Sequence, residues 1–197
     1  ATTAAKELEN TSVATVESYI KALEMSNLIY LAKPMDVGSK GALKGKPKIF
    51  IADAAICNAV LMIDDVLSDE SELGAMVETT VYKHMLSFYQ GSPAQLGYFR
   101  KARDNQKEVD VVAELPRQKI LCEVKYRNNS HIPATDAIVE LCQDQTTNVT
   151  NAFLITKRLD DFGITRHETA IPILRVPAIA FLYMLGKAEA LGHSGKL

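Results

Sequence analysis

The stretch that organises this chain is residues 108–126, which read EVDVVAELPRQKILCEVKY. Two runs rich in valine, isoleucine and leucine lie on either side of Pro116, and such runs are typical of strands. A proline cannot donate to a strand ladder, so we expect an antiparallel hairpin that turns at Pro116. Pairing about this turn places Asp110 opposite Glu123.

Asp110, Glu123 and Lys125 are charged residues within these otherwise apolar strands. Residues two apart on a strand share a face, so Glu123 and Lys125 point the same way, and Asp110 reaches them from the neighbouring strand. Charges in such strands are costly unless they are paired or bound to a metal. Asp110, Glu123 and the carbonyl of Val124 provide the hard oxygen ligands that Mg²⁺ or Mn²⁺ takes. Lys125 would position a water or neutralise charge on a phosphate. A satisfied ion network in a binding module is the alternative.

The elements around the hairpin predict an α/β fold, a mixed sheet flanked by helices. The helix expected between Tyr126 and Ala152 implies a parallel crossover connection. The hydrophobic periods predict further strands over 95–100, 152–156 and 171–176, and helices over 70–89, 133–145 and 177–185.

The first 52 residues read as a separate unit, a partial winged helix-turn-helix, followed by the mixed-sheet domain over 53–197. A helical pattern from Val13 precedes two short apolar strands, and glycines and five lysines lie between the strands. We expect an exposed hairpin loop over 36–46. Its lysines either contact nucleic-acid phosphates or simply solvate the loop; they are Lys40, Lys44 and Lys46.

Composition excludes several classes. The chain has 197 residues, 47% of them hydrophobic, and 22 basic against 24 acidic residues give a formal net charge of −2. It is therefore neither disordered nor basic throughout. No apolar run reaches the roughly 18 residues of a membrane span, and no signal peptide opens the chain. Three cysteines without metal-ligand spacing predict a reduced, cytoplasmic protein without a membrane partner.

Two motifs carry a resemblance to known families. Val109-Asp110, twelve residues, and then Glu123-Val124-Lys125 resembles the signature of PD-(D/E)xK nucleases, which have a restriction-endonuclease-like fold. The whole order of elements is similar to the C-terminal region of AAA-type ATPases of the DUF4143 class. It includes a strand that ends in Asp53 and a helix that contains Glu78. The resemblance implies that Glu78 is a further metal ligand beside Asp110 and Glu123, and that all three act in catalysis with Lys125.

The resemblance also implies an ATPase domain upstream of residue 1, because residues 41–47 lack the spacing of a phosphate-binding loop. We expect a metal-dependent nuclease whose strand-end arginines, Arg100, Arg103 and Arg127, hold backbone phosphates. Two alternatives remain. The chain is a non-catalytic module that regulates the ATPase, or it is a winged-helix DNA-binding protein.

Overall fold

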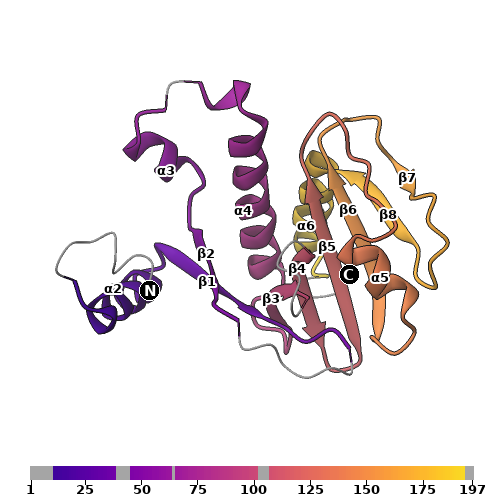
Figure 1. Ribbon diagram of the computed structural model, residues 1–197, viewed down its shortest axis with the longest axis horizontal. Helices are drawn as coiled ribbons and strands as arrows, with labels where there is room; N and C mark the ends of the chain where they lie inside the picture. Colours follow the sequence, from indigo (N-terminus) through magenta and orange to yellow (C-terminus); the bar gives the residue numbers. More distant parts are fainter. Residues whose placement is uncertain (1–10, 39–44, 64, 102–106, 194–197) are drawn as a thin grey trace.

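The computed structural model describes residues 11–38, 45–63, 65–101 and 107–193, which form a mixed α/β fold (Figure 1). The strands of this part of the chain build one eight-stranded sheet in the order β2-β1-β3-β4-β5-β6-β8-β7. They are β1 (Ile29–Pro34), β2 (Lys48–Ile51), β3 (Gln95–Arg100), β4 (Glu108–Leu115), β5 (Gln118–Lys125), β6 (Val149–Thr156), β7 (Gly163–Ile164) and β8 (Ile173–Pro177). The helices are α2 (Val13–Met25), α3 (Ala55–Val60), α4 (Glu70–Phe88), α5 (Ala137–Gln143) and α6 (Ala178–Ala190), with a 3-10 turn at Val66–Ser68.

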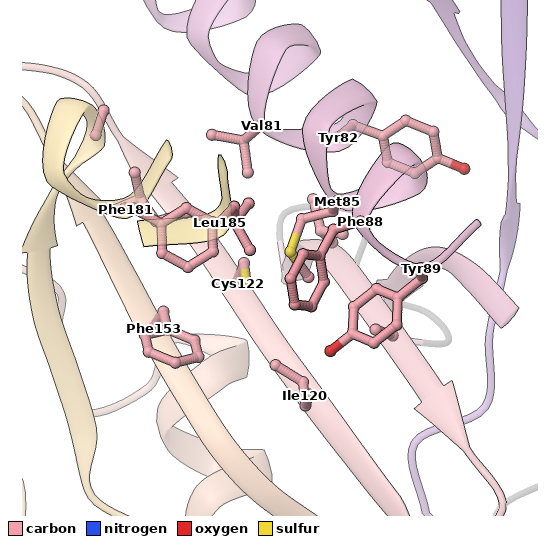
Figure 2. Packing of buried hydrophobic residues seen from close by; sticks show 14 of the residues in the cluster. Val81, Tyr82, Met85, Phe88, Tyr89, Ile120, Cys122, Phe153, Phe181 and Leu185 are labelled. Carbon is pink, nitrogen blue, oxygen red and sulfur yellow. The ribbon is translucent and has the colours of Figure 1, made fainter. Parts of the chain in front are cut away.

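Helices cover both faces of the sheet, which confirms the predicted mixed sheet flanked by helices. Helices α4 and α6 pack on one face, and Figure 2 shows Val81, Met85 and Phe88 of α4 gathered with Phe181 and Leu185 of α6. Helix α5 packs on the other face through buried residues that include Ile138 and Cys142. Each fully buried large side chain contributes roughly 1.5–3 kcal/mol, so these contacts fix both layers.

The central hairpin has the predicted register. Val111 of β4 pairs with Cys122 of β5, and Leu115 pairs with Gln118 across the turn. The observed pairing ends at Val111 and Cys122, the neighbours of Asp110 and Glu123. Strand β5 then pairs in parallel with β6 after the α5 connection, as the helix between Tyr126 and Ala152 predicts.

A β-bulge changes the direction of Asp110. Gly97 and Phe99 of β3 pair with Val112 and Val109 of β4, so Asp110 and Val111 together oppose one residue of β3. Val109 and Val112 pack on the α5 side of the sheet, whereas Val111 packs on the α4 side. Because Asp110 follows Val109, strand alternation places it on the α4 side as well.

The N-terminal unit is continuous with the main sheet. Ser12 caps α2 by accepting a hydrogen bond from the backbone N–H of Thr15 at 3.1 Å. Strands β1 and β2 pair antiparallel, as predicted, and β1 then pairs in parallel with β3 at Lys33 and Gly97. A Cβ at position 97 would stand 2.2 Å from the carbonyl oxygen of Lys33, so glycine permits this close approach.

The expected exposed loop over 36–46 is buried at its start, because Val37 is 3% exposed and packs in the core on the α5 side. Strand β7 was not predicted, because its two exposed residues carry no hydrophobic period. The expected loop lysines Lys40 and Lys44 lie outside the described residues, and so does Arg103, which was expected to hold phosphate.

Candidate functional site

A cleft of about 520 Å³ lies between the N-terminal half of α4 and the carboxyl end of β5. Asp69 begins α4 by accepting hydrogen bonds from the backbone N–H groups of Ser71 and Glu72. The structure places all four residues predicted to act in catalysis along this cleft, namely Glu78, Asp110, Glu123 and Lys125.

Asp110 is mostly buried, with 15% of its side chain exposed. Its Oδ2 accepts a hydrogen bond of 2.8 Å from the backbone N–H of Val124, so the carboxyl group bridges β4 and β5. Burial raises the pKa of Asp110 to about 7, and nearby Glu78 adds to the rise. Lys48 and the bond from Val124 offset only part of it.

Glu123 is 3% exposed and is the most buried acid of the cleft. Its Oε1 forms an ion pair with the Nζ of Lys125, whereas its Oε2 has no hydrogen-bond partner among the described residues. Burial raises the pKa of Glu123 well above its usual value, and the charge of Asp110 raises it further. A buried oxygen without a partner is rare in folded proteins and needs a physical explanation.

Lys48 is a member of this site that the sequence analysis missed. Its Nζ lies 2.8 Å from Oε1 of Glu78 and 3.6 Å from Oδ1 of Asp110, and it also pairs with Glu108. Burial alone would lower the pKa of Lys48, but these three carboxylates together raise it. The sequence signal for Lys48 is its position two residues before Phe50, because alternation along a strand places both side chains on the same face. In the structure, that face lies against α4, where Phe50 stacks on Tyr82.

The arginines and lysines expected to hold phosphate differ in their availability. Arg100 is engaged, because its Nε donates a hydrogen bond of 2.6 Å to Glu108. Arg127 is exposed and lines the cleft, and Lys46 is exposed two residues before β2. Arg127 is therefore the cation best placed to meet a phosphate at the cleft.

Two carboxylates of the cleft carry the oxygen atoms that a divalent cation takes as ligands. Asp110 and Glu123 supply hard oxygen atoms, and the unpartnered Oε2 of Glu123 has free acceptor capacity. Glu78 instead forms an ion pair with Lys48. Within the described ranges, no three His, Cys, Asp or Glu side chains are grouped so as to hold a metal ion. The third predicted ligand, Glu78, is therefore not preorganised with the other two.

The fold and the site define an α/β domain with an acidic cleft at the carboxyl end of a central strand. Residues 73–176 match the model of DUF4143, a domain of unknown function, over just over half of the chain. The chain belongs to this family, which is typically found in the C-terminal part of AAA-type ATPases. Residues 1–67 match a second domain of unknown function, DUF8612.

No curated protein matches the chain. Of the helices in the described ranges, none has the length and apolar character needed to cross a membrane.

Proposed function

We propose that this chain is a metal-dependent nuclease domain with a restriction-endonuclease-like fold, attached to an AAA-type ATPase. The observation that carries the proposal is the pair of buried acids, Asp110 and Glu123, at the edge of an open cleft. Burial raises the pKa of both carboxyl groups, which is a common property of catalytic and metal-binding sites. A cation bound between the two carboxylates would favour their ionised forms and so lower both pKa values again.

Five side chains of the cleft have a role in this proposal. Asp110 and Glu123 would hold Mg²⁺ or Mn²⁺, which supplies charge that lowers the pKa of water and neutralises the phosphate. Lys125 donates to Glu123 and would orient the attacking water or a phosphate oxygen. Arg127 would hold a flanking phosphate of the nucleic acid. Glu78 would join the metal only if Lys48 released it.

The test is cleavage of labelled DNA and RNA, single- and double-stranded, in the presence of Mg²⁺ or Mn²⁺. Lys125→Ala should abolish cleavage while metal affinity stays largely intact, because the lysine is not a ligand. Asp110→Asn should lose both. Lys187→Ala, in the last turn of α6, is the matched control and should cleave like the wild type. Cleavage by Asp110→Asn at the wild-type rate would overturn the catalytic assignment.

A second function has one observation in its favour. The ammonium group of Lys48 lies among Glu78, Glu108 and Asp110, so part of the acidic cluster is already neutralised by the protein itself. Such a network suits a non-catalytic, nuclease-like module that regulates the ATPase. This function predicts that millimolar Mg²⁺ neither binds nor stabilises the protein, whereas the nuclease function predicts both.

We also infer that α2, β1 and β2 are the second half of a winged helix-turn-helix. The helix, the antiparallel strand pair and the exposed Lys46 support this inference. The cytoplasmic location is part of the same proposal. It is supported by three free cysteines, of which Cys57 is exposed while Cys122 and Cys142 are buried.

A further inference from the structure

A second hollow lies at the same edge of the sheet, outside the proposed catalytic cleft. It has a volume of about 460 Å³ and opens where β5, β6 and β8, three parallel strands, reach their carboxyl ends. Ligands of open α/β sheets bind preferentially at this edge. The pocket is within the size range of sites for small organic ligands.

The pocket differs from the cleft in charge. Three arginines and two aspartates line the pocket, giving a formal charge of +1, whereas four acids and two bases line the cleft, giving −2. The arginines are Arg158, Arg166 and Arg175. In a chain whose net charge is −2, a cavity with three guanidinium groups favours an anion.

The ion pairs within this pocket leave some guanidinium N–H groups free to bind a ligand. Arg158 is committed, because its Nε and Nη2 lie 3.1 and 2.8 Å from the carboxylate of Asp160. Arg175 pairs with Asp161 through Nη1 at 3.0 Å, but its Nε is buried without a partner among the described residues. Arg166 is exposed and forms no ion pair or side-chain hydrogen bond within the described part of the chain.

Neutral polar groups complete the lining. The hydroxyl of Thr165 is buried without a partner among the described residues, and Asn128 and Asn129 also line the pocket. Ser130 holds Asp161 through a hydrogen bond of 2.7 Å, so that aspartate is oriented from two sides. A planar guanidinium that meets a tetrahedral oxyanion can form two parallel hydrogen bonds, which favours phosphate over a spherical anion.

The pocket and the cleft share one loop. Arg127 lines the cleft, and the residues that directly follow it, Asn128 to Ile132, line the pocket.

We propose that this pocket binds the phosphate group of a nucleotide, with Arg166 and Arg175 as its principal ligands. The nucleotide part of the inference rests on the proposed function, whereas the anion site stands on the pocket's own residues. Two sources share this chemistry, a free nucleoside monophosphate and the terminal phosphate of a nucleic-acid strand.

The test is calorimetric titration of the full chain, in EDTA, with inorganic phosphate and with adenosine 5′-monophosphate. Binding with a Kd on the order of millimolar or tighter is expected. Arg166→Ala should weaken binding about tenfold, the usual loss for one charged hydrogen-bond donor. Arg117→Ala, an exposed arginine in the β4–β5 turn, is the matched control and should bind like the wild type.

A second arginine variant and a second pair of ligands test the site further. Arg175→Gln should also weaken binding. If that variant fails to fold because Asp161 loses its partner, partial recovery of binding in Arg166→Lys relative to Arg166→Ala decides instead. An oligonucleotide with a 5′-phosphate, compared with its 5′-hydroxyl form, distinguishes a strand end from a free nucleotide.

Asp110→Asn should keep phosphate binding, so loss of nuclease activity and loss of this site are separable. No binding by the wild type, or binding that Arg166→Ala leaves unchanged, would overturn the proposal.

Discussion

Replacing Asp110 by asparagine should stabilise the metal-free protein at pH 8. Asparagine keeps the shape of the side chain and an acceptor oxygen for the N–H of Val124. Burial, with help from Glu78, raises the pKa of Asp110 from its usual 3.8 to about 7. A carboxyl group whose pKa rises on folding destabilises the folded state wherever it is ionised. The difference corresponds to ~4 kcal/mol at pH 8.

The sign of the effect depends on pH. Well below pH 4 the group is protonated in both the folded and the unfolded state, and the penalty disappears. Between about pH 4 and pH 7 the folded state binds more protons, so the wild type loses stability as the pH rises. Because Lys48 loses one of its three partners, we expect Asp110→Asn to gain about 2–4 kcal/mol at pH 8 and little at pH 4.

The assay is urea denaturation followed by circular dichroism, at pH 4, 6 and 8 in EDTA. Asp65→Asn, an exposed aspartate before the 3-10 turn, is the matched control and should change stability by less than about 0.5 kcal/mol at each pH. If Asp110→Asn were less stable than the wild type at pH 8, the claim that the ionised, buried carboxyl group destabilises the folded protein would be wrong.

Two further substitutions test the surroundings of the site. Lys48→Met should destabilise the protein by about 2–3 kcal/mol at pH 8, because it removes the cation that Glu78 and Asp110 share, whereas Glu108 keeps Arg100. The loss should shrink at pH 4, and Lys46→Met should be close to neutral by the same denaturation assay. Gly97→Ala should lower the melting temperature, because its Cβ would stand 2.2 Å from the carbonyl oxygen of Lys33. Gly74→Ala in α4 meets no atom within 4 Å and should raise the melting temperature. Equal shifts for the two variants would contradict the close packing of β1 on β3.

Much of the fold was predictable because its local signals agree. The apolar runs on both sides of Pro116 specify the hairpin and its register, and the observed pair Val111–Cys122 confirms that register. The cap at Asp69 and the apolar period after it define α4. Each of these signals depends on residues close together in the sequence, where period and turn chemistry are strong evidence.

The site was predictable only in part. Asp110, Glu123 and Lys125 are separated by one hairpin, so the hairpin register could bring them to the same end of the sheet, where all three line the cleft. The bulge that turns Asp110 toward α4 has no sequence signal, because it arises from how β3 and β4 pair. Lys48 reaches the acids through the packing of β2 beside α4, a contact between residues far apart in the sequence that local patterns do not indicate.

The most direct measurement is a calorimetric titration of Mn²⁺ into the wild type, Asp110→Asn and Lys125→Ala at pH 8. The account predicts that the wild type and Lys125→Ala bind one ion with a Kd on the order of millimolar or tighter, and that Asp110→Asn binds none. Wild-type protein that takes up no Mn²⁺, or Asp110→Asn that binds it with wild-type affinity, would contradict the assignment of Asp110 and Glu123 as a metal-binding pair.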